Sequence, residues 1–469
     1  MKPEHSDRDR RSPRTRSRPA EAGTVGNSAA RSFPGTLLVS KAIYLGLAGA
    51  TLALAAVGHP HPGRGFLVEF GVGLGFVGFV MLAFQFALTA KFRWLSRLVG
   101  LDVLLHFHRQ MGFFSYGFIL LHVGILISAQ PEYAAYLDFR VDVPRALALW
   151  TVLLALTAIL VTTIWREDLG LSYEWWRISH AALAALILFI GLVHILRVGW
   201  YIADPWKQWL WVGGTAAAVG LLVYTRLVKP LRLRSRRWRV SKVRPEPGRS
   251  WTVTLEAVDH RGLTFEAGQF IWLILGRTPP TAIQHPFSIS SSAAQEDVLE
   301  VTIKELGDHT SRIGEVKPGT VAFVEGPYGN FVLDDDVKEA VFVAGGVGIT
   351  PVMSILRTLR DRGLPLPTLL IYGMPSLEDA TFLGELEQLE EEGSPPLTLV
   401  PVFEAPPQGW TGETGRVTPK LLERRLPPDH PGVGYYVCGP EPMMDLVEKH
   451  LQEQGIPLSR IHSERFNIA

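Results

Sequence analysis

The chain has 469 residues, of which 47% are apolar and 19% are charged, and its formal net charge at pH 7 is +1. This length exceeds that of a usual single domain, so two or three domains are expected. The composition is too apolar for an ordinary soluble protein and too polar for a pure transporter, so we expect part of the chain to lie in a lipid bilayer. The sequence has no basic stripe with interleaved aromatic residues, which excludes nucleic acid as an expected partner.

Residues 1–35 are rich in Arg, Ser, Pro and Glu and contain little to bury, so they are predicted to form a disordered basic tail. The first apolar run after this tail is long enough to span a membrane, and no cleaved secretory signal is expected. Cys438 is the only cysteine. This count excludes an internal disulfide and a cysteine-ligated iron–sulfur cluster, so any metal must have other ligands.

Residues 36–228 are predicted to form a transmembrane bundle of six helices. Each apolar stretch is close to the ~20 residues needed to cross ~30 Å of hydrocarbon. Lys and Arg gather in the tail, after the second stretch, around the fifth and after the sixth, so the positive-inside rule places both termini in the cytoplasm of a multi-pass cell-membrane protein. The predicted spans are 38–57, 66–90, 104–128, 146–165, 178–197 and 207–225.

Ionisable residues are costly inside a membrane, yet four histidines that repeat one spacing lie inside two of these spans. His108 and His122 are fourteen residues apart in the third span, and His180 and His194 repeat this spacing in the fifth. Fourteen residues advance a helix by about 21 Å and return to within about 40° of the same face. Two such helices can supply two axial imidazoles to each of two stacked haem irons. The spacing therefore predicts a site for two b-type haems.

Histidines in and near the spans can also have roles other than haem binding. A single intramembrane histidine often does no more than hydrogen-bond between helices, but a spacing repeated on two spans argues against this. His106 is sixteen residues from His122, which rotates it about 160° away, so it is not expected to be a ligand. His59 and His61 lie in the first outer loop, where a metal substrate could bind, although a loop histidine is more often plain surface.

A linker at 229–240 leads into a different sequence pattern. Residues 241–335 contain short alternating apolar runs separated by Gly, Pro and Ser, which predict a small antiparallel β-barrel. In residues 336–469, β-rich runs alternate with helical ones. This alternation is typical of an α/β domain with a parallel sheet and helices on both faces.

The barrel segment carries a short polar and aromatic motif. His285, Pro286, Phe287 and Ser288 are followed by Gly307 and Thr310. These residues resemble the flavin motifs of the ferredoxin–NADP reductase superfamily, although His285 stands where Arg is commoner. The resemblance implies that Phe287 stacks on the flavin ring, that Ser288 contacts its N5 edge, and that Gly307 and Thr310 receive the pyrophosphate of FAD. Lys304 is a further candidate for cofactor binding.

A glycine-rich turn follows an apolar run and opens a helix, as a dinucleotide-binding turn does. Together with a later cysteine motif it resembles the nucleotide domain of the same superfamily, whose cysteine lies beside the nicotinamide carbon that gives up hydride. Cys438 as a merely buried thiol is the alternative. Phe466 matches the aromatic residue that covers the flavin in relatives. The candidate nucleotide-binding residues are Gly345, Gly346, Gly348, Thr350, Pro351, Cys438, Gly439 and Pro440.

Residues 36–469 as a whole resemble a bacterial member of the ferric reductase and NADPH oxidase superfamily. The resemblance implies an enzyme that passes electrons from cytoplasmic NAD(P)H through FAD to an inner haem, held by His108 and His180, and then to an outer haem, held by His122 and His194. Ser288, Cys438 and Phe466 are the expected catalytic residues. A flavin is needed because nicotinamide delivers two electrons as hydride whereas a haem iron accepts one.

Several points stay open at the level of sequence. Acidic residues at Glu378 and Asp379 would repel a 2′-phosphate and favour NADH, although Arg416 could still reach such a phosphate. The acceptor is expected to be a small molecule, oxygen reduced to superoxide or ferric iron. One alternative is an electron-transfer subunit that feeds a quinone or a periplasmic redox partner. Another is a non-redox receptor with a degenerate reductase tail, which the intact motifs argue against.

Overall fold

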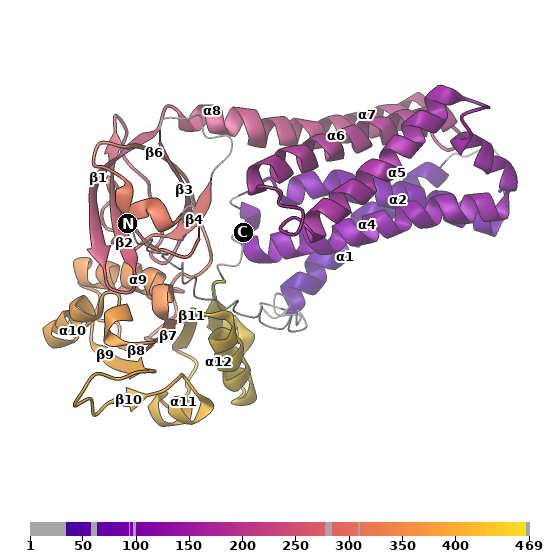
Figure 1. Ribbon diagram of the computed structural model, residues 1–469. Helices are drawn as coiled ribbons and strands as arrows, with labels where there is room; N and C mark the ends of the chain where they lie inside the picture. The colour runs from indigo at the N-terminus through magenta and orange to yellow at the C-terminus, as the bar shows by residue number, and fades with distance from the viewer. Residues whose placement is uncertain are drawn as a thin grey trace, which may run out of the picture.

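The computed structural model describes residues 34–57, 63–92, 94–96, 100–276, 284–307 and 310–465. Three parts follow one another along the chain: a bundle of long helices, an antiparallel barrel-like sheet and a parallel α/β domain (Figure 1). The predictions of an antiparallel and of a parallel sheet are both confirmed. Residues 1–33 of the predicted basic tail lie outside the described residues, as do His59 and His61, whereas Pro34 and Gly35 begin α1.

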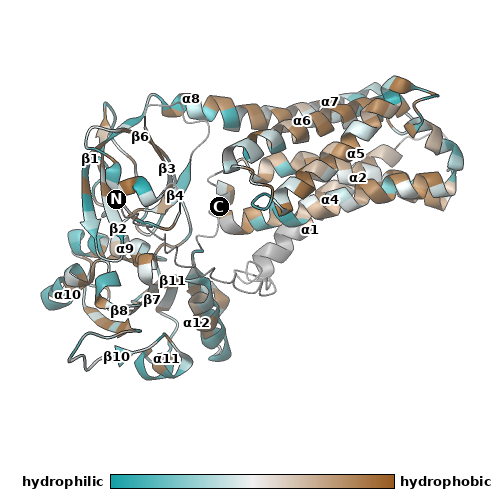
Figure 2. Cartoon of the chain, in the orientation of Figure 1, coloured by the Kyte–Doolittle hydropathy of each residue, from teal (hydrophilic) through white to brown (hydrophobic). Residues whose placement is uncertain are grey.

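Among the described residues, five helices are long and apolar enough to cross a membrane. The first predicted span lies in α1 (Pro34–Ala56), of which Ala42–Ala56 forms a shorter apolar helix. Figure 2 shows that hydrophobic residues predominate along the long helices of the bundle. The chain is therefore a multi-pass membrane protein. The five long helices are α2 (Phe66–Leu88), α4 (Leu101–Ala129), α5 (Val143–Ile164), α6 (Tyr173–Val198) and α7 (Pro205–Val223).

Local signals in the sequence set where these helices begin and end. The side chain of Asp142 accepts a hydrogen bond from the backbone N–H of Arg145 and caps α5, and Ser172 caps α6 in the same way. Gly199 ends α6 in the left-handed conformation, which glycine adopts without a steric penalty. A 3₁₀ segment, η2 (Pro131–Leu137), joins α4 to α5.

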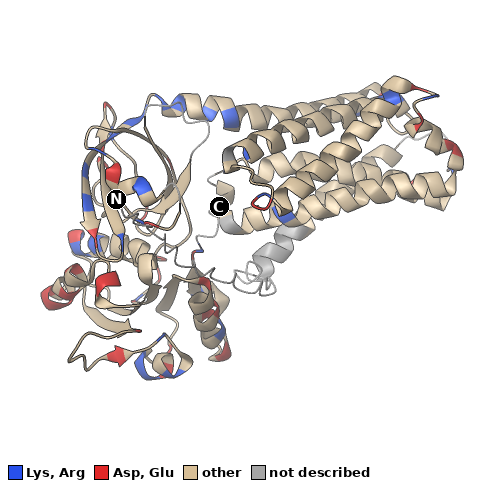
Figure 3. Ribbon diagram, viewed as in Figure 1, with Lys and Arg blue, Asp and Glu red and all other residues tan. Residues whose placement is uncertain are grey.

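The helix α7 continues through one π turn, η3 (Tyr224–Val228), into α8 (Lys229–Leu233), which leads from the bundle to the barrel (Figure 1). Figure 3 shows few charges along the middle of the bundle, whereas Lys and Arg lie on α8 and at the end of the bundle beside the barrel. The end of the bundle that faces the barrel is therefore basic.

The barrel domain is a six-stranded antiparallel sheet in the order β4-β3-β6-β1-β2-β5. Alternate residues such as Val253, Leu255 and Val301 point inward and are fully buried, as the period of two in a strand requires. The strands are β1 (Arg237–Glu246), β2 (Ser250–Val258), β3 (Phe270–Leu275), β4 (His285–Ser288), β5 (Val298–Lys304) and β6 (Val321–Tyr328).

The α/β domain is a parallel sheet in the order β10-β9-β8-β7-β11-β12. Helices α9 (Ile349–Asp361) and α10 (Leu383–Glu392) cover one face, and α11 (Pro419–Arg425) and α12 (Glu441–Glu453) cover the other. Its central strands are apolar on both faces because both are buried. The strands are β7 (Glu339–Gly345), β8 (Thr368–Met374), β9 (Leu397–Phe403), β10 (Glu413–Thr414), β11 (Val433–Cys438) and β12 (Ile461–Ser463).

Candidate functional site

The membrane histidines lie on α4 and α6, and the structure brings them together in pairs. The ring centroids of His108 and His180 are 6.2 Å apart. Two imidazoles that bind one metal ion from opposite sides place their centroids about 6 Å apart, because each metal–nitrogen bond is about 2 Å long. The space between these two rings therefore fits one iron atom with two axial imidazoles.

The second pair lies at the other end of the same helices. His122 and His194 line one cavity of about 200 Å³, whose walls are mainly apolar. The Nδ1 atom of His122 lies 2.9 Å from the carbonyl oxygen of Gly71, which can only accept a hydrogen bond. Nδ1 is therefore the protonated nitrogen, and Nε2 keeps the lone pair that a metal needs.

A close contact between two helices allows this geometry. A Cβ atom on Gly75 would lie 2.6 Å from Nδ1 of His122, so any larger residue on α2 would displace the ring. No local pattern in the sequence marks Gly75, because the contact joins two different helices. His106, which was not expected to be a ligand, instead pairs with Gln110 at 2.8 Å.

The residues at both pairs fit haem. In the described part of the chain no three His, Cys, Asp or Glu side chains gather around a point, so each pair can offer two protein ligands. In a haem the porphyrin would supply four ligands to the iron, and the two histidines of each pair would supply the other two. The apolar walls of the second cavity suit the macrocycle.

Arg64 was not singled out from the sequence, yet it lines the cavity of His122 and His194. Its guanidinium donates a hydrogen bond of 3.1 Å to the hydroxyl of Tyr201 and lies 3.7 Å from the carboxylate of Glu69. It also lies over the ring of Trp200, 4.9 Å from the centroid. A cation is thus fixed at the edge of this cavity. A charged residue directly before an apolar span was the only signal for it in the sequence.

The expected flavin residues lie on β4 and in the loop after β5. Ser288 pairs with Phe270 of β3, and Phe287 pairs with Ile271. Ser288 is buried, and its hydroxyl has no hydrogen-bond partner among the described residues. A buried unpaired hydroxyl costs free energy unless another group satisfies it, so it fits a contact with a bound cofactor. The rings of His285 and Phe287 lie 6.4 Å apart on the same strand.

The loop after Lys304, the last residue of β5, is closed by Thr310. The hydroxyl of Thr310 accepts hydrogen bonds from the backbone N–H groups of Leu306 and Gly307, at 3.0 and 3.1 Å. These two N–H groups are thus directed to a side chain of the loop itself. The short helix η4 (Thr310–Glu315) starts at the same residue.

The glycine-rich turn and the cysteine motif meet at the carboxyl ends of β7 and β11. Ala344 pairs with Cys438 across these strands. A Cβ atom on Gly348 would lie 2.4 Å from the carbonyl oxygen of Cys438, and one on Gly345 would lie 2.7 Å from Pro440. Only glycine permits this approach.

The rest of the turn is fixed by its own hydrogen bonds. The hydroxyl of Thr350 donates a hydrogen bond of 2.7 Å to the carbonyl oxygen of Val347. Gly346 adopts a positive φ of 52°, and Pro351 lies in the first turn of α9. The backbone at the start of α9 is therefore shaped as a dinucleotide-binding turn requires.

Cys438 is fully buried. Burial raises the pKa of its thiol well above the ordinary value, and the carboxylate of Glu464 raises it further. The thiol is therefore protonated at neutral pH and is not a nucleophile. This environment fits a group that packs beside a reacting atom.

Glu464 is a buried acid that the sequence analysis missed. A Cβ atom on Gly329 would lie 2.8 Å from its carboxylate and 3.0 Å from the ring of Phe270. Glu464 and Phe270, which pairs with Ser288, thus both lie beside Gly329, and the carboxylate of Glu464 is close enough to Cys438 to raise the pKa of its thiol. Its signal was its position two residues before Phe466, which itself lies outside the described residues.

The C-terminal segment is fastened to α12. The guanidinium of Arg465 lies 2.9 Å from Glu448 and 2.8 Å from Asp445. Burial alone would lower the pKa of Arg465, but these carboxylates raise it. The ion pairs therefore hold the neighbouring Glu464 in place.

The residues that bear on nucleotide preference lie near the end of β8. Glu378 belongs to the exposed 3₁₀ turn η6 (Leu377–Asp379). Arg416 is ion-paired with Glu404 at 3.1 Å and its side chain is exposed. Its neighbour Val417 lies against Gly373 of β8, so Arg416 is close to the same edge of the sheet.

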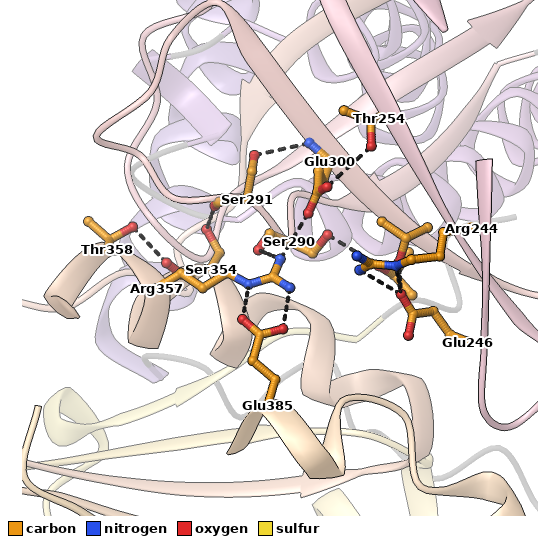
Figure 4. A network of polar contacts seen from close by, with 12 residues as sticks. Arg244, Glu246, Thr254, Ser290, Ser291, Glu300, Ser354, Arg357, Thr358 and Glu385 are labelled. Atoms are coloured by element: carbon orange, nitrogen blue, oxygen red, sulfur yellow. Dashed lines mark hydrogen bonds and ion pairs between the residues drawn. The ribbon is translucent and has the colours of Figure 1, made fainter. Parts of the chain in front are cut away.

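Figure 4 shows the polar network that joins the barrel to the α/β domain. Arg357 of α9 is buried, and its guanidinium binds Glu385 through two hydrogen bonds of 2.7 and 2.6 Å. It also donates to the backbone oxygen of Ser290 and to Glu300, both in the barrel. Ser290 follows the flavin strand by two residues and α9 follows the nucleotide turn. The network therefore fixes the two cofactor segments relative to each other.

Three regions of the chain match known protein families. Residues 239–332 match an FAD-binding domain and residues 342–449 match an oxidoreductase NAD-binding domain. This half of the chain is thus a flavin-dependent oxidoreductase module. Residues 74–191 match the ferric reductase like transmembrane component. The chain therefore carries a region similar to a ferric reductase-like membrane domain, followed by regions similar to FAD- and NAD-binding domains.

Curated relatives share this module. The NADPH oxidoreductase of Mycobacterium tuberculosis is 30% identical over 259 residues, which are 52% of this chain and 64% of that protein. NADH-cytochrome b5 reductase 1 of Aspergillus clavatus is 30% identical over 192 residues, 39% of this chain and 62% of that protein. The glycine betaine monooxygenase reductase subunit of Pseudomonas aeruginosa is 30% identical over 207 residues, which are 43% of this chain and 56% of that protein. The chain spans about three fifths of the length of these relatives.

Among solved structures, the Amycolatopsis cytochrome P450 reductase GcoB is 27% identical with a TM-score of 0.43, and the match covers 49% of this chain and 69% of that one. The cytochrome b5 reductase domain of Ulva prolifera nitrate reductase is 18% identical with a TM-score of 0.44, and the match covers 49% of this chain and 97% of that one.

Proposed function

We propose that this protein moves electrons across a membrane from cytoplasmic NAD(P)H, through FAD and two b-type haems, to an acceptor on the other side. The acceptor is oxygen, reduced to superoxide, or ferric iron. The observation that carries the proposal is the spacing of 6.2 Å between His108 and His180, together with the second pair in one cavity at the other end of the same two helices. The protein then lies in the cell membrane with both termini in the cytoplasm.

On the nucleotide side, the chain positions the donor and the flavin. Ser288 presents its unpaired hydroxyl, and Gly345 and Gly348 let the glycine-rich turn pack closely against the motif of Cys438, which places the expected nucleotide-binding turn beside the cysteine. The protonated thiol excludes water without adding a charge. When bound, the flavin supplies the step from two-electron to one-electron chemistry.

On the membrane side, the four histidines would hold two irons, and haem would supply reversible one-electron chemistry. His108 and His180 would hold the haem nearer the barrel, and His122 and His194 the farther one. Arg64 would place a positive charge at the edge of the farther site, where an anionic group or product is stabilised.

The acidic residues after β8 support NADH as the donor. Glu378 and Asp379 lie in an exposed turn there, and Arg416 is already paired with Glu404. A 2′-phosphate would be repelled by the first two residues and would have to compete for the third.

The test is anaerobic reduction of the full-length protein, loaded with haem and FAD, by NADH or NADPH. Oxygen is then admitted while the haem spectrum and superoxide are recorded together. Fast haem reoxidation with stoichiometric superoxide identifies an oxidase. Haems that stay reduced in air but are reoxidised by a ferric chelate identify a ferric reductase.

Two other outcomes would change the conclusion. Haems that are reoxidised by neither acceptor, but only by a quinone or an added periplasmic redox protein, would make the protein an electron-transfer subunit. A purified protein that binds no haem would disprove transmembrane transfer through the histidines.

A further inference from the structure

The bundle and the barrel meet at two lysines of the membrane part. Lys229 of α8 lies 2.7 Å from the carboxylate of Glu325 on β6. Lys91, which follows α2, lies 3.3 Å from the side-chain oxygen of Gln284 and 3.5 Å from the ring centroid of Trp272. Both cations thus reach from the bundle onto the barrel.

The barrel meets them with one buried carboxylate. Glu325 is 6% exposed, and it accepts hydrogen bonds from the hydroxyl of Tyr328 at 2.8 Å and from the amide of Gln284 at 3.3 Å. Burial alone would raise its pKa, but Lys91 and Lys229 lower it to about 2. The cations that keep Glu325 ionised therefore both belong to the membrane part, and a separated barrel would leave this carboxylate without them.

Pro230, the residue after Lys229, affects the direction in which the Lys229 side chain leaves the helix. Pro230 has no N–H group and cannot complete the α-helical ladder, so the preceding turn widens to a π turn. In that turn the backbone N–H of Lys229 bonds to the carbonyl oxygen of Tyr224, five residues earlier. The turn changes the phase of the helix just before the lysine that reaches Glu325.

An apolar contact lies beside the charged cluster. Leu101, at the start of α4, packs with Phe270, Trp272 and Tyr328 of the barrel in one buried group, and Leu105 packs against it. Phe270 pairs with Ser288, the expected flavin contact.

The same face of α4 leads to the first histidine pair. Leu101, Leu105 and His108 follow the i, i+4, i+7 spacing of one helix face, over about 10 Å of helix axis. The end of α4 that precedes His108 thus packs in one buried group with β3, the strand that pairs with the flavin strand β4.

We infer that Lys91, Lys229 and Glu325 are positioning residues that hold the flavin barrel against the end of α4, so that electrons pass from the flavin toward His108. The inference rests on the proposed function. When bound, a reduced flavin would give its two electrons one at a time to ferric haem iron and would release its proton to solvent, so that two transfers would account for the electrons of one hydride.

The experiment compares Glu325→Gln and Lys229→Met with wild type and with a control, Lys449→Met and Glu453→Gln, which removes an exposed lysine–glutamate pair on α12. Stopped-flow absorbance follows flavin reduction by NADH and haem reduction separately under anaerobic conditions. Flavin reduction should change less than about twofold, whereas haem reduction should slow about tenfold or more. Lys229→Arg should restore most of the haem rate, because it keeps the charge.

A second readout does not depend on activity. Hydrogen–deuterium exchange of the oxidised full-length protein in nanodiscs should become faster in β3 and in the first turns of α4 for both Glu325→Gln and Lys229→Met, and should stay unchanged in the control pair. Lys229→Met tests the same contact from the membrane side if Glu325→Gln loses FAD.

The outcomes separate this inference from the proposed function. Equal exchange in wild type and in both single variants overturns the docking role, as does equal slowing of flavin and haem reduction. If wild-type haem is absent or is not reduced by NADH, the proposed function fails, while exchange at β3 and α4 still decides whether the cluster docks the barrel.

Discussion

His122 donates a hydrogen bond of 2.9 Å from Nδ1 to the carbonyl oxygen of Gly71, and this contact joins α4 to α2. Because the backbone oxygen fixes the tautomer, Nε2 is left to face the cavity shared with His194. This arrangement is the one expected of a histidine whose Nε2 binds a metal.

Replacing this histidine should remove one of two haems. In His122→Ala the haem content per protein should fall by about half, since the first pair keeps both of its axial ligands. The measurement is the pyridine haemochrome assay on purified protein. His106→Ala, which removes a histidine that pairs with Gln110 and is not an expected ligand, should keep the full content. Unchanged haem in His122→Ala would contradict the assignment.

Ser288→Ala should slow hydride transfer to the flavin. The unpaired hydroxyl is expected to hydrogen-bond to the flavin, and the loss of such a bond in the transition state costs about tenfold to a hundredfold in rate. The check is the rate of flavin bleaching after mixing with NADH. Ser288→Thr keeps a hydroxyl and should recover most of the rate. A variant as fast as wild type would remove Ser288 from the reaction.

Gly348→Ala should impair nucleotide binding more than replacement of a glycine whose added methyl group would meet no other atom. The new methyl group would lie 2.4 Å from the carbonyl oxygen of Cys438, so the turn and the cysteine motif must separate. The NADH dissociation constant should rise about tenfold or more, measured by calorimetry on oxidised protein. Gly384→Ala, where a Cβ meets nothing within 4 Å, is the control. Equal affinities in the two variants would argue against a close contact.

The stability contributed by Glu325 should depend on pH. Its pKa is about 2 in the folded protein, below the ordinary value of 4.5. A carboxylate with a lowered pKa stabilises the fold above its ordinary pKa and loses this effect as the pH falls toward the folded value. The difference amounts to about 3 kcal/mol. The midpoint of thermal unfolding of wild type should therefore exceed that of Glu325→Gln near neutral pH, and the gap should narrow below pH ~4.5. A constant gap would show that the charge is not responsible.

Arg357→Met should destabilise the reductase module strongly. Its removal leaves Glu385 and Glu300 without their buried cation, and breaking a buried ion pair in this way costs about 3–5 kcal/mol. Lys449→Met, in an exposed pair, should change stability by less than ~1 kcal/mol. Denaturant unfolding followed by flavin fluorescence compares the two. Similar small effects would show that the network in Figure 4 is solvated.

The long helices, the histidine spacing and the glycine-rich turn could be predicted from the sequence alone. Apolar stretches of about twenty residues give the helices that cross the membrane, because a bilayer leaves no other way to satisfy backbone hydrogen bonds. The equal spacing of His108 from His122 and of His180 from His194 follows from helical geometry alone. The turn at Gly345 and its position after β7 are also local.

The contacts between residues far apart in the sequence depend on tertiary packing. Gly75 makes room for His122, Glu464 turns back beside Cys438, and Lys229 reaches Glu325 across almost one hundred residues of chain. None of these contacts has a periodic signal, since each depends on how separate elements pack. The sequence therefore determines which chemical groups each helix or strand carries, and the packing of these elements determines the distances between the groups.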